Sequence, residues 1–253
     1  MDPIRQTAQD VLLSVNQNLI QKNDQGPTHC TTCQGTGWVP TVDKAGNNCV
    51  RECECAKQRR LHARIATILQ DWPEYAQASI DDFKPRSVGQ NNAAIALQEN
   101  ISGSYYFTGL YRRGKTFFLV AQYRAMALAG NKCLLRSARD LAEELRASEV
   151  NTNGTEPVPS AVMYLVNHET AAHLFIDDIE KVAASAFRSE MLWDILDTVK
   201  RRQLRLSVSS NLPLYLKDEV KYRDKNKPLP DLRDKLGDAI VSRLYQICKV
   251  VEL

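Results

Sequence analysis

Two groups of side chains in this sequence could do chemistry, and the first forms a loop that could bind phosphate. Residues 109–116 read GLYRRGKT: glycine, four residues, glycine, lysine and threonine. A phosphate loop needs backbone N–H groups converging on an anion at a helix N-terminus, a lysine that reaches the β- and γ-phosphates, and a hydroxyl for Mg²⁺. The spacing therefore favours an ATP site, although arginines fill the middle of the loop, where small residues are usual. The residues expected to bind the nucleotide are Gly109, Arg112, Arg113, Gly114, Lys115, Thr116 and Phe117.

The acidic and polar residues that such a site needs follow later in the chain. The apolar run HLFI ends in Asp177 and Asp178. Asp177 can hold Mg²⁺ together with Thr116, and Asp178 can polarise the attacking water. A further run, RLSVSS, ends just before Asn211, whose side chain could touch the γ-phosphate or position the water. The alternative for Asn211 is a turn-forming role before Pro213.

The second group is a cluster of cysteines near the N-terminus. The chain has seven cysteines, and five of them lie within residues 30–55. Such crowding in a cytosolic chain favours metal over disulfides, and four thiolates complete a tetrahedral zinc site. Cys49 could replace Cys53 or Cys55 as a ligand, and His29 is a further alternative ligand. The expected zinc ligands are Cys30, Cys33, Cys53 and Cys55.

The pattern of apolar residues predicts how these groups are positioned. Residues 4–20 have helical spacing, and residues 56–70 return to it after the cysteine segment. Beyond two prolines, short β-like runs alternate with helix-compatible segments, which is typical of an α/β fold with a parallel sheet. We therefore expect a small N-terminal domain over residues 1–69 and a larger one over residues 70–253. The expected strands are SYYFTG, KCLLRS, HLFIDD, RLSVSS and ICKVVEL.

Composition sets wider limits on the chain. Its 253 residues are 43% hydrophobic, which suits a buried core rather than disorder. No apolar run approaches the length of a membrane span, and the N-terminus lacks a signal core, so we expect a cytoplasmic protein without a membrane partner. The net charge of +3 is too small by itself to indicate a nucleic-acid binder. Bases cluster locally at residues 57–64, 112–113 and 200–205, where they could contact phosphates or simply be solvated.

Four pieces in this order resemble the AAA+ ATPases of the DnaC/DnaI and IstB group, which are bacterial helicase loaders and transposition helpers. The pieces are GLYRRGKT, LFIDDIE, SSN and LGDAIVSRLYQI, and WPEYAQASIDDF resembles the segment before the ATPase core of that group. The resemblance covers about residues 70–253. It implies an AAA+ P-loop domain with a five-stranded parallel sheet flanked by helices, and ATP bound between subunits of an oligomer. By the same resemblance, Arg243 matches the arginine that reaches the γ-phosphate of the neighbouring subunit.

The sequence departs from this group in three places. Leu110, Arg112 and Arg113 replace a proline and glycine-rich centre of the loop. Asp178 replaces a longer glutamate, so that its reach to a water molecule is shorter. The sequence also stops at KVVEL, before the region where the group often carries another nucleotide-sensing arginine. We therefore expect ATP binding with slow hydrolysis.

The resemblance leads to an expectation about function as well. It implies an ATP-dependent loader that grips a replicative DNA helicase through its N-terminal domain and engages single-stranded DNA through its assembled ATPase domains. One alternative is a transposition helper of the IstB kind, assembled on duplex DNA. The other is a non-catalytic zinc adaptor whose nucleotide site is degenerate, for which the two arginines of the loop are the best support.

Overall fold

The computed structural model describes residues 30–150, 161–169, 172–182, 186–221 and 229–253. The helix expected over residues 4–20 and the alternative zinc ligand His29 lie outside these ranges. The chain divides into two compact units, residues 1–67 and 68–253, and the division falls at the end of a helix. None of the helices in the described ranges combines the length and the apolar character needed to cross a lipid bilayer.

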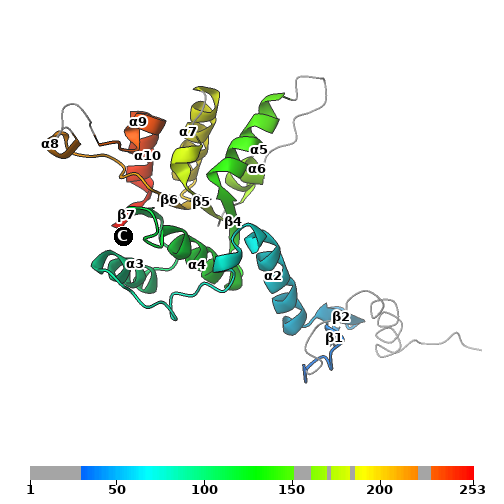
Figure 1. Cartoon of the computed structure of the whole chain (residues 1–253). Helices are drawn as coiled ribbons and strands as arrows, with labels where there is room; N and C mark the ends of the chain where they lie inside the picture. Colours follow the sequence, from blue (N-terminus) through cyan, green and yellow to red (C-terminus); the bar gives the residue numbers. More distant parts are fainter. Residues whose placement is uncertain (1–29, 151–160, 170–171, 183–185, 222–228) are drawn as a thin grey trace, which may run out of the picture. The chain divides into compact units, whose positions relative to one another are not determined.

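The described part of the first unit is a β-hairpin followed by a helix (Figure 1). Strand β1 (Trp38–Val42) pairs antiparallel with β2 (Asn48–Glu52), and α2 (Glu54–Ile68) follows directly. The hairpin turn is closed by Asp43, whose Oδ1 accepts hydrogen bonds from the backbone N–H groups of Ala45 and Asn47 at 2.8 and 2.9 Å. Sequence patterns did not predict this hairpin, because most of its residues are exposed and lack an apolar alternation.

The second unit is built around a five-stranded sheet of order β4-β5-β6-β3-β7, in which every pairing is parallel. This confirms the predicted α/β fold and its parallel sheet. The strands are β3 (Tyr105–Thr108), β4 (Lys132–Ser137), β5 (Ala172–Asp177), β6 (Arg205–Ser210) and β7 (Lys249–Glu252). All five β-like runs of the sequence therefore form strands of one sheet.

Helices cover both faces of this sheet (Figure 1). On one face lie α3 (Val88–Glu99) and α4 (Lys115–Leu128). On the other face lie α5 (Ala138–Val150), α6 (Ala161–His168), α7 (Ala186–Arg201), α9 (Arg233–Leu236) and α10 (Asp238–Ile247). The short elements are the 3₁₀ helices η1 (Leu69–Asp71), η2 (Pro73–Tyr75) and η3 (Ile179–Lys181), and the helix α8 (Asp218–Lys221).

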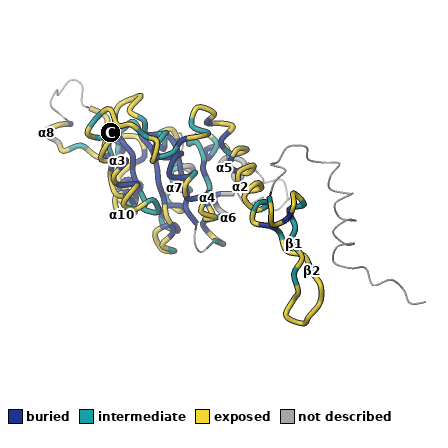
Figure 2. Tube along the Cα trace, turned by 90° about the horizontal axis from the view of Figure 1, so that it is seen from below, coloured by how far each residue is buried: buried dark blue, intermediate teal, exposed yellow. Residues whose placement is uncertain are grey.

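The side chains of strand β3 show why helices must cover both faces of the sheet. Because successive side chains of a strand point to opposite faces, Tyr106 and Phe107 enter different layers of the core. Tyr106 belongs to the cluster formed with α7 and α10, whereas the Phe107 ring stacks with Phe118 of α4 at 6.1 Å between centroids. All four residues of β3 are buried, as expected for a strand inside a parallel sheet. Figure 2 shows in dark blue that the buried stretches of this unit lie among more exposed segments. The loop after β3 therefore starts from a rigid position.

Candidate nucleotide and metal sites

The loop between β3 and α4 has the backbone path that its glycines permit. Gly109 has a φ of +140°, and a Cβ atom there would lie 2.5 Å from the carbonyl oxygen of Leu253. Gly114, with a φ of +91°, is the N-cap of α4. Both conformations are costly for residues with a side chain, so the two motif glycines are required by the turn. The loop therefore presents its backbone at the N-terminus of a helix, where anions bind favourably.

Lys115 is held along this loop. Only 6% of its surface is exposed, and its Nζ donates hydrogen bonds to the carbonyl oxygens of Gly109 and Leu110 at 2.9 and 2.8 Å. Burial lowers the pKa of the Lys115 ammonium, because desolvation disfavours its charge. The nearby carboxylates of Asp178 and Glu180 act in the opposite sense and favour the charged form. The cation thus lies between the loop and an acidic strand edge.

Asp177 is the buried carboxylate at the end of β5. Its Oδ1 accepts hydrogen bonds from Thr116 Oγ1, at 3.1 Å, and from the Ser209 hydroxyl, while its Oδ2 accepts one from Trp72 Nε1, at 3.2 Å. Burial raises the pKa of Asp177, and these hydrogen bonds oppose that shift. The structure thus brings together the two side chains that the sequence assigned to Mg²⁺. An aspartate and a threonine offer the oxygen ligands that this ion prefers.

Asp178 and Asn211 also lie at this edge of the sheet. Asp178 has a φ of +56°; its backbone N–H donates to Ser209 Oγ at 2.9 Å, and its carboxylate pairs with Lys181. Asn211 Nδ2 lies 3.4 Å from Asp178 Oδ1. The two residues predicted to act on the water and the γ-phosphate are therefore neighbours at the ends of β5 and β6.

Three residues of this site were not predicted from the sequence: Trp72, Ser209 and Glu180. Glu180 Oε1 accepts hydrogen bonds from the backbone N and the Nδ2 of Asn211 at 3.2 and 2.7 Å. Its Oε2 is buried and has no hydrogen-bond partner among the described residues. The letters LFIDDIE contain Glu180, but only the turn after β5 places its carboxylate against Asn211. Ser209 alternates with apolar residues in β6 and could have been found from that polar position.

The side chains of the other residues predicted to bind the nucleotide, Arg112, Arg113 and Phe117, lie on the exposed surface of the loop or pack on other residues. Arg112 and Arg113 are exposed, and the carbonyl oxygen of Arg113 accepts a hydrogen bond from Gln90 Nε2 at 3.0 Å. The ring of Phe117 packs on that of Phe83, with 4.7 Å between centroids. Its side chain is therefore part of an aromatic cluster, and its backbone lies in the first turn of α4.

Arg243 lies on α10, and its side chain contacts residues of α7 and α10. Its Nη2 lies 2.8 Å from Asp197 Oδ1, and its Nη1 donates to Gln246 Oε1 at 3.1 Å. Its guanidinium also lies 5.6 Å from the centroid of the Trp193 ring. These contacts do not bring Arg243 to the phosphate loop of its own chain.

A pocket of about 440 Å³ opens beside the loop. Residues of the loop form one wall, and the segments after β6 and along α10 and β7 form the others. Its lining includes Gly109, Arg113, Asn211, Tyr215, Tyr245 and Leu253. The aromatic rings of Tyr215 and Tyr245 are 6.3 Å apart.

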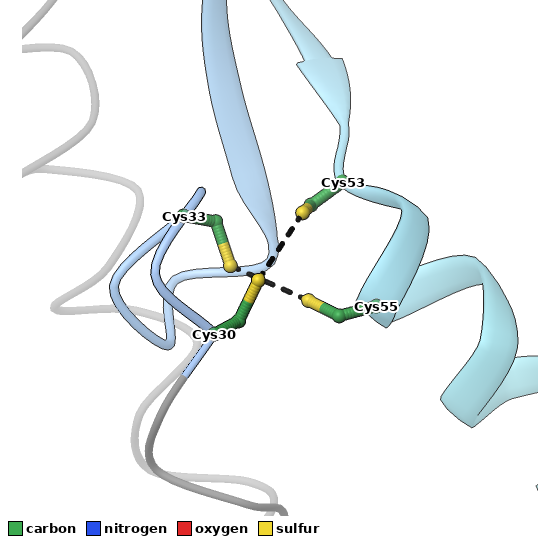
Figure 3. Close-up of side chains that lie close together, drawn as sticks. All are labelled: Cys30, Cys33, Cys53 and Cys55. Atoms are coloured by element: carbon green, nitrogen blue, oxygen red, sulfur yellow. Dashed lines mark hydrogen bonds between the residues drawn. The ribbon is translucent and has the colours of Figure 1, made fainter.

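The four cysteines predicted to bind zinc converge in the first unit (Figure 3). Their sulfur atoms all lie within 4.8 Å of one another, with 3.8 Å between Cys30 and Cys53 and 3.4 Å between Cys33 and Cys55. Cys49 lies on β2 opposite Thr41 and is not part of this cluster. The geometry thus selects Cys53 and Cys55 over Cys49.

Hydrogen bonds within this cluster shift the pKa values of its cysteines in opposite directions. The backbone N–H of Cys33 is the largest influence on Cys30 and lowers its pKa to about 6. The hydrogen bond with Cys33 is the largest influence on Cys55 and raises its pKa to about 12. The backbone N–H of Gly37 also donates to Cys33 Sγ at 3.3 Å, which favours a thiolate there. Four sulfur atoms at this separation suit a tetrahedral metal ion.

Comparison with known proteins gives the fold. No family model and no curated protein matches the chain. Among solved structures, the DnaC helicase loader superposes with a TM-score of 0.56 at 19% identity, over 71% of this chain and 98% of that one. DnaI gives 0.52 at 19% identity, over 71% and 89%. AMPPCP-bound DnaA from Aquifex aeolicus gives 0.51 at 18%, over 70% of this chain and 50% of that one. The larger unit therefore has the fold of these AAA+ proteins, as the sequence predicted.

Proposed function

We propose that this chain is a Mg²⁺-dependent ATPase that acts in DNA replication as a helicase loader. The observation that carries the ATPase part is the convergence of the loop lysine, the Thr116–Asp177 pair and Asn211 at one edge of the parallel sheet. Ligands of open α/β sheets bind at the carboxyl ends of the strands, which is where these side chains lie. The AAA+ fold supports the same activity.

Each residue has a defined task in this proposal. The loop backbone and Lys115 bind the β- and γ-phosphates, and Thr116 with Asp177 would hold Mg²⁺, which neutralises developing charge on the phosphate oxygens. Asp178 orients the attacking water and accepts its proton, while Asn211 contacts the γ-phosphate. The γ-phosphate is thereby transferred to water and ADP leaves.

Slow turnover follows from the surroundings of Asp178. Its carboxylate is one methylene shorter than a glutamate and is already engaged with Lys181 and Asn211. A general base contributes most when its lone pair points at the proton that it removes. We therefore expect nucleotide binding with slow hydrolysis, which would serve as a timer for release rather than as a motor.

Titration of the protein with Mg-ATP tests the ATPase proposal. The wild type should bind saturably, and Lys115→Ala should weaken binding at least tenfold, because two charge-assisted phosphate contacts are lost. Lys235→Ala removes an exposed lysine of the same unit and serves as the matched control. If the wild type shows no saturable binding, the adaptor hypothesis replaces the ATPase proposal.

The loader part rests on two features of the chain. Its larger unit shares its fold with DnaC and DnaI, and a cysteine-rich unit precedes it. We propose that the first unit docks on a replicative helicase and that ATP-bridged subunits, with Arg243 reaching the neighbour's γ-phosphate, engage single-stranded DNA. To reach a neighbour, Arg243 would have to leave its contact with Asp197.

Co-purification with the host's replicative helicase tests this docking, using the full chain and a chain that lacks residues 1–66. Capture by the full chain alone supports the loader. Capture by neither favours the transposition helper, whose assembly on duplex DNA can then be measured by sedimentation with and without ATP.

Zinc is the metal that we propose for the cysteine cluster. Zn²⁺ favours four thiolates in tetrahedral geometry, and a small unit whose described residues include few buried apolar ones gains folding energy from such a site. Elemental analysis of the purified protein should find about one zinc ion per chain. A protein that is folded and free of zinc would overturn this assignment.

A further inference from the structure

Trp72 makes a contact with the magnesium carboxylate that no sequence motif predicts. It lies between η1 and η2, at the start of the second unit, and only 8% of its surface is exposed. Its indole Nε1 donates a hydrogen bond to Asp177 Oδ2 at 3.2 Å, across 105 residues of chain. An indole N–H is a donor only, so the direction of this hydrogen bond is fixed.

A count of lone pairs shows what this bond does to Asp177. A carboxylate has about four acceptor positions, two on each oxygen. Oδ1 accepts from Thr116 and Ser209, so both of its positions are used. Oδ2 accepts from Trp72, which leaves one position on that oxygen. The indole therefore fixes the orientation of the free lone pair of Asp177 Oδ2.

The indole is itself held in place by the segment around it. The backbone N–H of Trp72 donates to Leu69 O at 3.0 Å, and its carbonyl oxygen accepts from the N–H of Tyr75 at 2.9 Å. The Tyr75 ring packs edge-on against Phe117 with 6.5 Å between centroids. Phe117 follows Thr116 in the first turn of α4, so the same short segment contacts the helix that carries the other predicted Mg²⁺ ligand.

We propose that Trp72 is a positioning residue for the magnesium site: its indole N–H orients Asp177 so that one lone pair of Oδ2 is available to a divalent cation. This inference rests on the ATPase proposal, because it assigns the same carboxylate to the ion. Loss of the N–H removes the hydrogen bond that orients Oδ2, so the carboxylate can turn about the hydrogen bonds of its Oδ1, and the affinity for the cation falls. Binding of ATP without the cation does not involve this bond and stays unchanged.

A Trp72→Phe variant of the full chain tests the proposal, because it keeps an aromatic ring and removes the N–H. The measurement is binding of a fluorescent ATP analogue as a function of Mg²⁺ concentration, together with direct binding of Mn²⁺ followed by electron paramagnetic resonance. We expect the half-saturating cation concentration to rise about tenfold, while the affinity for the analogue in EDTA stays within about twofold of wild type, since one charge-assisted hydrogen bond is removed. Trp38→Phe, which makes the same substitution in the first unit, is the matched control and should bind nucleotide and cation as the wild type does.

Replacement of Trp72 with benzothienylalanine, which has the shape of tryptophan and no N–H, separates the hydrogen bond from packing. It should reproduce the rise in half-saturating cation concentration even if Trp72→Phe fails to fold. An unchanged or lower value in this variant overturns the proposal, as does an equal loss of analogue affinity in EDTA, which indicates a merely structural role. If the wild type binds no nucleotide at any cation concentration, the ATPase proposal fails. If the wild type binds nucleotide and the variants have the same half-saturating cation concentration as the wild type, the Trp72 inference fails alone.

Discussion

Two carboxylates lie within reach of Asn211, and their roles can be separated with isosteric substitutions. We predict that Asp178→Asn slows hydrolysis by about 10²–10⁴-fold, because a general base supplies a factor of that size. This corresponds to about 3–5 kcal/mol of activation free energy. ATP affinity should not fall, since one negative charge near the triphosphate is removed.

The structure also bounds the effect on stability. The Asp178 carboxylate pairs with Lys181, and the two side chains are 30% and 58% exposed. A pair in this position contributes at most about 1 kcal/mol to the free energy of unfolding. Asp178→Asn should therefore melt close to the wild type, so that a large kinetic loss reports on chemistry and not on unfolding.

Glu180→Gln is the matched comparison. Glu180 Oε1 accepts both hydrogen bonds from Asn211, and Oε2 has no partner among the described residues. A glutamine can keep its carbonyl oxygen toward Asn211 and place its –NH₂ group where Oε2 was. We therefore expect hydrolysis to fall by less than about tenfold, because no general base is removed.

The assay is single-turnover phosphate release at saturating Mg-ATP, with binding of a fluorescent ATP analogue and thermal melting measured on the same preparations. A loss of 10²-fold or more in Glu180→Gln, with Asp178→Asn near wild type, would refute the assignment. Glu180 would then be the residue that activates the water, and Asp178 would only anchor the turn after β5.

Three other predictions concern zinc, acid stability and the contact between subunits. Cys33→Ser should lower the zinc content well below one ion per chain, whereas Cys49→Ser should leave it unchanged, as measured by elemental analysis of folded protein. Burial by itself would raise the pKa of Asp231, but hydrogen bonds from Arg233, Leu216 and Lys221 outweigh it and hold that pKa at about 2, below its ordinary value. The resulting contribution of about 2 kcal/mol to the free energy of unfolding is present above pH 4 and is lost as the pH falls toward 2. Urea unfolding should show the difference between wild type and Asp231→Asn shrinking over that range, and a constant difference would contradict it. Mixing Arg243→Ala with Lys115→Ala subunits should restore part of the ATPase activity if the arginine acts across subunits, and no recovery would place its role within the α7–α10 contact.

The sheet could be predicted from the sequence because each strand carries its own signal. A strand buried on both faces reads as a continuous apolar run, as LFI does in β5. Since parallel strands place their carboxyl ends at one edge, the order of the motifs also predicted that the acidic residues after β5 and Asn211 after β6 lie at the same edge of the sheet. The hairpin β1–β2 carries no such signal, because its residues are mostly exposed and its order comes with the cysteine cluster.

The contacts that could not be predicted depend on the path of the chain between motifs. Trp72 lies far from Asp177 in sequence and reaches it only through the segment that packs on α4. Phe117 adjoins Thr116 in the motif, yet its ring packs on that of Phe83 in an aromatic cluster. Position in a motif predicts where a backbone lies, whereas neighbours from other elements decide where a side chain points.

The same distinction explains how the loop accommodates its two arginines. Among residues 110–113, only Arg112 has a positive φ, of +62°, which costs a residue with a side chain about 1 kcal/mol. Arg113 avoids that conformation, and the side chains of both arginines are exposed. Phosphate binding by such a loop depends on backbone N–H groups and on Lys115, so the arginines need not disturb it. Their charge lies at the exposed rim of the loop, where Arg113 also lines the neighbouring pocket and where two cations increase the local attraction for anions.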